Sequence, residues 1–126
     1  ETLATLSADY PLLLITKGDL LHQTGKVARS GLGRYFAGIE VVADKTPEVY
    51  REILTRRHVP PERFVMVGNS PRSDIYPVAA LGGRAIHVPH ENMWSYDLVD
   101  VPEDLPGTVY RVGRVAEVTA LIGGWD

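Results

Sequence analysis

Short apolar runs alternate along this chain with segments whose apolar residues recur at helical spacing, and this pattern predicts alternating strands and helices. Strands are expected at residues 12–15, 39–43, 64–67 and 84–88, with an edge strand at 109–112. The first run, Leu12 to Ile15, is unbroken, as expected for a parallel strand covered on both faces. The alternation indicates βαβ units. We therefore predict an α/β fold with a Rossmann-like parallel sheet in a three-layer α/β/α arrangement.

Helices are expected between these strands. The segment 20–30 should turn Leu21, Val27 and Ala28 inward and stop at Gly31. Further helices are predicted at 74–81, which Gly82-Gly83 closes, and at 115–122.

Thr46-Pro47 is a strong helix start, because Thr caps an amino terminus and Pro suits the first helical position. The spacing of apolar residues then predicts a buried stripe, which consists of Val49, Tyr50, Ile53 and Leu54.

Residues 1–6 have the pattern of a helix already under way, which Pro11 interrupts. We therefore expect residues 1–9 to be the end of a helix, and the chain to be the carboxyl-terminal part of a longer protein. At 126 residues it is expected to form one domain with a sizeable core.

The overall composition excludes several classes of protein. A net charge of −3 argues against nucleic-acid binding, which normally needs a basic face. No apolar run approaches a membrane span, no signal peptide is visible, and without cysteine there is neither a disulfide nor a thiolate metal site. We expect a cytoplasmic protein that binds neither nucleic acid nor membrane.

Polar residues that can carry chemistry follow three of the predicted strands directly. Thr16-Lys17-Gly18 follows the first strand, Lys45 follows the second, and Gly68-Asn69 follows the third, with Asp74 five residues beyond Asn69. Open α/β folds place their chemistry at the carboxyl ends of parallel strands. A hydroxyl, an ammonium group and oxygen ligands for a hard cation at one sheet edge would suit phosphoryl transfer, which depends on positioning and charge stabilisation.

This arrangement resembles the haloacid dehalogenase (HAD) superfamily of phosphohydrolases over roughly residues 10–95. The resemblance implies a HAD-like core with its motif-bearing body at 12–95 and a carboxyl-terminal strand and helix at 96–126. It implies that Thr16 binds the phosphoryl group and that Lys45 neutralises the charge of the nucleophile and the phosphate. Gly18, and Lys17 beside Thr16, are then further candidates for phosphate contact.

The resemblance also implies that a loop corresponding to Gly68, Asn69 and Asp74 holds Mg²⁺. Asn69 stands where the family more often has aspartate, so it offers a neutral carbonyl oxygen and should weaken the metal site. One or two protein ligands suffice, because Mg²⁺ keeps several waters. Arg72 in this loop could contact phosphate, although a solvent-facing position is the simpler interpretation.

The family's nucleophile, an Asp-x-Asp segment on the central strand, does not occur in this sequence. Asp97 and Asp100 have the wrong place and spacing. The resemblance therefore implies an incomplete core whose amino-terminal strand is missing. We expect a companion, either an amino-terminal segment of the same protein or a second copy, and no activity from the isolated chain.

Each residue alone also has a simpler interpretation: Thr16 as a turn residue, Lys45 as a solvated lysine, Asn69 in an ordinary turn and Asp74 as a helix cap.

Residues 87–96 follow the fourth strand and carry two histidines and three large apolar side chains. His87 and His90 are spaced as a strand running into a loop, so they favour a structural role over a metal pair. Met93, Trp94 and Tyr96 are expected to pack over the end of the sheet.

The leading functional hypothesis is a Mg²⁺-dependent phosphatase of a small phosphorylated metabolite, acting through an aspartyl-phosphate. A metal-independent haloacid dehalogenase and a catalytically inactive binding module are the alternatives. The substrate itself cannot be named, because in this family the cap, absent here, selects it.

Overall fold

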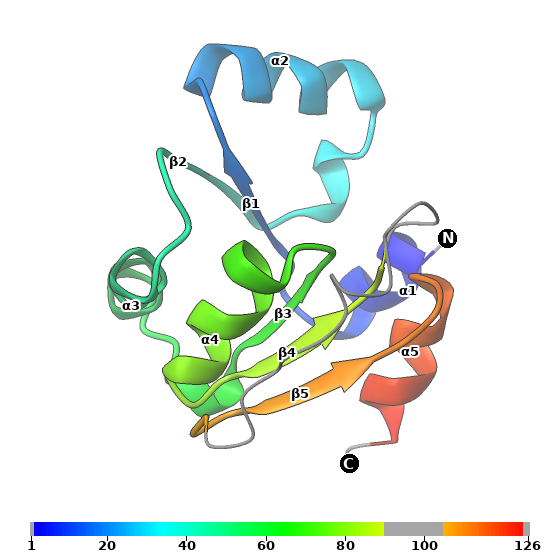
Figure 1. Cartoon of the computed structure of the whole chain (residues 1–126). Helices are drawn as coiled ribbons and strands as arrows, with labels where there is room; N and C mark the ends of the chain where they lie inside the picture. Colours follow the sequence, from blue (N-terminus) through cyan, green and yellow to red (C-terminus); the bar gives the residue numbers. More distant parts are fainter. Residues whose placement is uncertain (1, 90–104, 125–126) are drawn as a thin grey trace. The chain divides into compact units, whose positions relative to one another are not determined.

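The computed structural model of the chain describes residues 2–89 and 105–124 (Figure 1). Strands and helices alternate, and each strand pair is parallel. The predicted α/β class with parallel strands is therefore confirmed, and the five predicted strands are present with ends shifted by two residues or fewer. The three-layer arrangement stays a prediction. The strands form two sheets, and the chain divides into two compact units, Glu1–Asp44 with Thr119–Asp126, and Lys45–Val118.

The first unit is built around a two-stranded parallel sheet. Its elements are α1 (Thr2–Asp9), β1 (Leu13–Lys17), α2 (Leu20–Ser30), the 3-10 turn η1 (Gly33–Tyr35) and β2 (Gly38–Val42). The register runs from Leu13 opposite Gly38 to Lys17 opposite Val42, so both strands end level. The polar residues that follow β1 and β2 therefore start from the same edge of this sheet.

Helix α2 has the predicted bounds, but the prediction that its side chains face inward is wrong for two of the three residues. Asp19 caps its amino end, and Gly31 ends it in the left-handed region at φ 73°. Val27 is half-buried, whereas Ala28 is exposed and Leu21 is 82% exposed. Val27 lies against η1, and at about 100° per residue the side chains of Leu21 and Ala28 project far around the helix from it. The contact face is thus narrower than the apolar pattern suggested.

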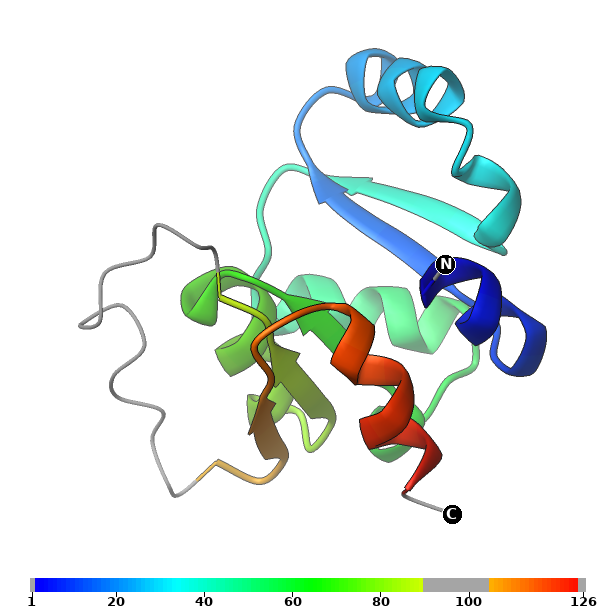
Figure 2. The same cartoon turned by 90° about the vertical axis from the view of Figure 1, so that its right-hand side faces the viewer.

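The second unit contains a three-stranded parallel sheet in the order β3-β4-β5, and Figures 1 and 2 show these strands side by side. Its elements are α3 (Pro47–Arg56), the 3-10 turn η2 (Pro61–Arg63), β3 (Val65–Gly68), the π-helical turn η3 (Pro71–Ile75), α4 (Tyr76–Ala80), β4 (Arg84–His87) and β5 (Thr108–Arg111). Helix α5 (Ala116–Gly123) starts in this unit and continues past its boundary.

Three of the four residues in the predicted stripe of α3 form part of the core. Tyr50, Ile53 and Leu54 are buried, and Val49 is half-buried. They pack in the unit that also buries Ile75, Val78, Ala79, Ala85 and Ile86. Helix α3 contacts α4, and α4 contacts β4. Burial of this apolar face fixes the start of α3, and with it Lys45, relative to the end of β3.

The helical backbone after β3 begins earlier than predicted. The sequence pattern placed a helix at 74–81, whereas the turn η3 already begins at Pro71 and leads into α4. The cap is Ser70, whose side chain accepts a hydrogen bond from the Ser73 amide at 3.3 Å. Asp74 therefore lies inside the turn, and its interpretation as a helix cap is wrong.

In the described part of the chain, no helix combines the length and apolarity needed to cross a lipid bilayer. The cytoplasmic location stays a prediction.

Candidate active site

The three strands of the second unit end level with one another. Gly68, His87 and Arg111, the last residues of β3, β4 and β5, stand opposite one another in the register. Asn69 follows Gly68 directly, so the Asn69–Asp74 loop leaves from the carboxyl edge of this sheet. That is the edge where open α/β folds bind ligands.

Lys45 and Asp74 form an ion pair at this edge. Lys45 Nζ lies 2.7 Å from Asp74 Oδ1, and the two side chains are only 13% and 7% exposed. The start of α3 supplies the lysine and turn η3 supplies the aspartate. A charged hydrogen bond this short and this sheltered from water is a strong one, and removing either partner would leave a charge with little solvation.

The carboxylate of Asp74 is also held by the backbone of its own loop. Its Oδ2 accepts a hydrogen bond from the Ser70 amide at 3.1 Å, and the Asp74 amide donates to the Ser70 carbonyl oxygen at 2.8 Å. Gly68 makes room for this arrangement, because a Cβ at that position would overlap the Asp74 side chain. The glycine is therefore required by the close approach of Asp74.

Asn69 and His87 meet at the ends of neighbouring strands. The Asn69 side chain is exposed, and its backbone carbonyl oxygen lies 3.2 Å from Nε2 of the buried His87. A carbonyl can only accept, so His87 donates through Nε2–H. Burial lowers the pKa of His87, which favours the neutral ring. His87 is thus a structural support of the loop, as the sequence suggested, while His90 lies outside the described residues.

Tyr50 is a contact that the sequence pattern did not predict. Its hydroxyl donates a hydrogen bond to the Ser73 carbonyl oxygen at 2.8 Å, although its side chain is only 1% exposed. Burial raises the pKa of this hydroxyl, and the negative charge of Asp74 raises it further. The sequence feature that could have indicated this contact is a tyrosine in an otherwise apolar stripe, since a buried phenol needs a hydrogen-bond partner.

The remaining predicted site residues belong to the first unit. Thr16 is half-buried on β1, opposite Val41. Lys17 is exposed, and its Nζ lies 3.6 Å from Asp44 Oδ1. Gly18 has φ 136°, a value that L side chains rarely adopt, and its amide donates to Val42 O at 3.0 Å. The structure thus brings Lys45 and Asp74 together, whereas the convergence of Thr16, Lys17 and Gly18 on them stays a prediction.

The loop offers the type of ligand atom, oxygen, that magnesium prefers. Asp74 offers carboxylate oxygens with lone pairs left after two hydrogen bonds, and Asn69 offers an exposed amide oxygen. Mg²⁺ accepts such oxygen ligands and keeps several waters. Within residues 2–89 and 105–124 no cluster of three or more His, Asp or Glu side chains could hold a metal, so any cation here would depend on a small ligand set.

Of the remaining sequence candidates, one lies in the described part of the loop. Arg72 is exposed, in line with its solvent-facing interpretation. The others lie outside the described residues: Asp97, Asp100, Met93, Trp94 and Tyr96.

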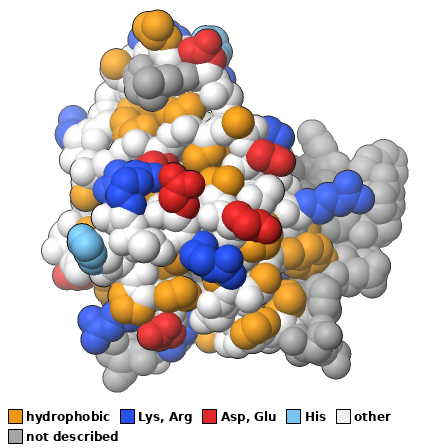
Figure 3. Space-filling model, turned by 90° about the vertical axis from the view of Figure 1, so that its left-hand side faces the viewer, with side chains coloured by type: hydrophobic (Ala, Val, Ile, Leu, Met, Phe, Trp, Pro, Cys, Tyr) orange, Lys and Arg blue, Asp and Glu red, His pale blue; other side chains and the backbone are white. Residues whose placement is uncertain are grey.

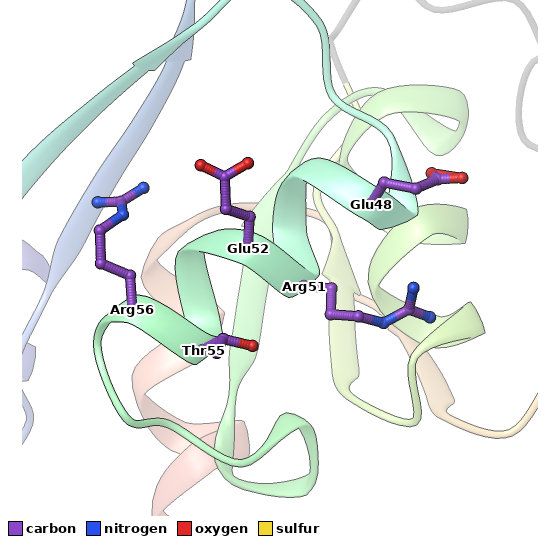
Figure 4. A pocket seen from close by; sticks show the side chains of 5 residues that line it. All are labelled: Glu48, Arg51, Glu52, Thr55 and Arg56. Atoms are coloured by element: carbon purple, nitrogen blue, oxygen red, sulfur yellow. The ribbon is translucent and has the colours of Figure 1, made fainter.

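A shallow surface depression is lined by residues of α3 alone, and none of them belongs to the Asn69–Asp74 loop. Its lining residues are Glu48, Arg51, Glu52, Thr55 and Arg56 (Figure 4). Glu52 and Arg56 are spaced four apart and extend to the same side of the helix, the favourable order for a pair of charges. Figure 3 shows acidic and basic side chains interspersed on one face of the molecule. The depression has the features of a solvated helix face.

Comparison with known proteins gives matches among solved structures. No family model matches the chain, and no curated protein matches it. A haloacid dehalogenase-like family hydrolase from Xanthomonas campestris is 41% identical, with a TM-score of 0.83 over 98% of this chain and 51% of its own. A 2-haloacid dehalogenase from Pseudomonas syringae pv. Tomato is 27% identical, with a TM-score of 0.74 over 99% and 51%.

A third similar structure supports the fold alone. A HAD hydrolase from Bacillus subtilis, solved bound to magnesium, is 19% identical, with a TM-score of 0.79 over 96% of this chain and 53% of its own. The chain thus spans about half the length of each of these three structures. Over nearly its whole length, the chain is structurally similar to solved structures of the HAD-like hydrolase superfamily, and its fold resembles part of a HAD core.

Proposed function

We propose that this chain is part of a HAD-like, Mg²⁺-dependent phosphatase acting on a small phosphorylated metabolite. It supplies Thr16, the charge-neutralising Lys45 and the cation ligands Asn69 and Asp74. The observation that carries the proposal is the sheltered Lys45–Asp74 pair, 2.7 Å apart at the carboxyl edge of a parallel sheet. The 41% identity to a HAD-like hydrolase supports the reaction class. The substrate stays undefined beyond its class.

In this proposal each residue has a distinct electrostatic or positioning role. Thr16 donates its hydroxyl to the phosphoryl group, and the Lys45 ammonium group offsets negative charge that develops there. Lys17 and the backbone at Gly18 contribute further phosphate contacts. Asn69 and Asp74 would hold Mg²⁺, which when bound supplies positive charge beside the phosphoryl oxygens. The nucleophilic aspartate, which forms the aspartyl-phosphate, lies outside these 126 residues.

The proposal includes a companion that carries an Asp-x-Asp segment, because this sequence has none. The companion is either an amino-terminal segment of the same protein or the corresponding segment of a second copy of a longer natural protein, because a second copy of these 126 residues would also lack Asp-x-Asp. Native and denaturing mass spectrometry of the natural protein separates these forms. A second polypeptide or a longer chain with Asp-x-Asp supports the proposal, and a natural protein without that segment contradicts it.

A second candidate function has its own support. The 2-haloacid dehalogenase match is 27% identical, and Asn69 offers a neutral amide where a metal site gains from a carboxylate. In addition, both oxygens of Asp74 already accept hydrogen bonds. A metal-independent dehalogenase would use the same Lys45–Asp74 pair without a bound metal ion.

One set of assays on the natural protein that contains this chain tests both functions. Phosphate release from small phosphomonoesters and halide release from short 2-haloacids are measured with Mg²⁺ and with EDTA. Phosphate release that EDTA abolishes supports the phosphatase, whereas halide release unaffected by EDTA supports the dehalogenase. Neither activity, in a protein that unfolds cooperatively, would favour the inactive binding module.

Variants link either activity to this site. Lys45→Met and Asp74→Asn should each lower kcat by at least 100-fold, since a removed charge-stabilising group costs roughly that factor. Glu52→Gln, on the exposed face of α3, is the control and should retain activity. Full activity in Asp74→Asn would contradict the assignment of this loop.

A further inference from the structure

Helix α3 reaches the Asn69–Asp74 loop at two points. Lys45 immediately precedes its Thr46 cap and contacts the side chain of Asp74 at 2.7 Å. Tyr50, in the next turn, contacts the backbone of the loop at Ser73 O, 2.8 Å away. The first contact fixes the carboxylate, and the second fixes the peptide group that joins Ser73 to Asp74. Helix α3 and the residue before its cap therefore hold both the side chain of Asp74 and the peptide group that precedes it.

The loop needs such support because of its backbone conformation. Residues Pro71–Ile75 form a π-helical turn, a rare conformation that is frequently found at functional sites. The turn has its own local hydrogen bonds through Ser70. The Tyr50 bond, by contrast, joins residues 23 apart in sequence and so ties the turn to a different element.

Tyr50 itself is held firmly. Its side chain is 1% exposed, and its ring centroid lies 6.5 Å from that of Phe64. Its amide donates to Thr46 O at 3.1 Å, within the first turn of α3. Because its hydroxyl stays protonated at physiological pH, it is a permanent donor.

We propose that Tyr50 is a positioning residue that sets the Asp74 carboxylate against Lys45 by holding the Ser73 carbonyl. This inference rests on the proposed function of the Lys45–Asp74 pair, but it concerns a residue that touches neither substrate nor cation. A small misplacement of a catalytic group lowers the rate of the chemical step more than it weakens substrate binding. Loss of the hydroxyl should therefore lower kcat and leave KM nearly unchanged.

The test compares Tyr50→Phe with Tyr35→Phe in the natural protein that contains this chain. Tyr50→Phe removes only the hydroxyl and keeps the buried ring. Tyr35→Phe is the matched control, since the hydroxyl of the half-buried Tyr35 accepts a 2.7 Å hydrogen bond from its neighbour Arg34 in an exposed contact. Amide hydrogen exchange at residues 70–76, kcat, KM and the midpoint of thermal unfolding are measured for both variants.

We expect Tyr50→Phe to accelerate exchange at residues 70–76 by about 10-fold or more and to lower kcat by about 3- to 30-fold at nearly constant KM. Tyr35→Phe should change neither. Unchanged exchange in Tyr50→Phe would overturn the proposal, and so would accelerated exchange with wild-type kcat. If the wild-type protein hydrolyses no phosphate ester or haloacid, the proposed function fails, while the exchange measurement still decides whether Tyr50 holds the loop.

Discussion

Gly68 and Asp74 are so close that the aspartate side chain occupies the space where a Cβ of residue 68 would lie. The last residue of β3 therefore has to be glycine for the carboxylate to turn back over the strand end. From there Asp74 reaches both the Ser70 amide and the Lys45 ammonium group. The site thus requires a glycine at position 68 as well as the charges of Lys45 and Asp74.

Gly68→Ala should destabilise the protein by about 1–3 kcal/mol, because the added methyl displaces Asp74 from its contacts. Urea unfolding measures the change. Gly123→Ala is the control: a methyl there meets open space at the end of α5, so stability should be retained or should rise by up to about 1 kcal/mol. Equal stability of Gly68→Ala and wild type would contradict the close approach.

Lys45→Met should lower the free energy of unfolding by about 3 kcal/mol, because it leaves the carboxylate of Asp74 without the lysine ammonium group. Asp74 is buried, with 5% of the residue exposed. Asp74→Asn should cost a similar amount. The double variant should be less destabilised than the sum of the two, by about 1 kcal/mol or more, since the two side chains interact directly. Additive losses in the same urea series would show that the pair is not coupled.

The stability of the protein should fall as pH decreases below the ordinary His pKa of 6.5, in part because of His87. Burial lowers the pKa of His87 in the folded state, so the unfolded chain binds that proton more readily. The stabilisation is fully present above 6.5 and is lost as pH falls from there through the lower folded-state pKa.

His87→Gln keeps an N–H donor for Asn69 O but cannot titrate in this range. Its unfolding free energy should therefore depend less on pH between about 7.5 and 5.5, by at most about 1.4 kcal/mol per pH unit, the slope for one proton. Denaturant unfolding at several pH values gives both slopes. An identical slope in His87→Gln would rule out His87 as the source.

The backbone amides of β1 and β2 should exchange with solvent faster than those of β4. Ile15 is the only apolar side chain buried among the described residues of the first unit, and its sheet has two strands. Two strands alone are marginally stable, whereas β4 has a strand on each side. Hydrogen exchange by mass spectrometry should show about 10-fold or greater differences in rate. Equal protection in both units would contradict this expectation.

Much of the local structure could be predicted because its determinants lie within four residues of one another. Thr46-Pro47 starts a helix, as predicted, with the Thr46 hydroxyl accepting from the Val49 amide at 3.2 Å. Ser70-Pro71 carries the same signal, and there the helical turn begins before its predicted start at Asp74. The inward face of α2 could not be predicted, because what covers a helix is decided by elements remote in sequence.

The sequence by itself determined the α/β class, the positions of the strands and the choice of Lys45 and Asp74 as candidates, since apolar runs, caps and polar strand ends are local features. Only the tertiary structure decided that Lys45 and Asp74, 29 residues apart, share an ion pair, and that Tyr50 holds Ser73 across 23 residues. Such contacts arise when α3 packs beside α4 and thereby brings separate segments to one sheet edge. Their geometry depends on the sum of many buried contacts, which no short stretch of sequence contains.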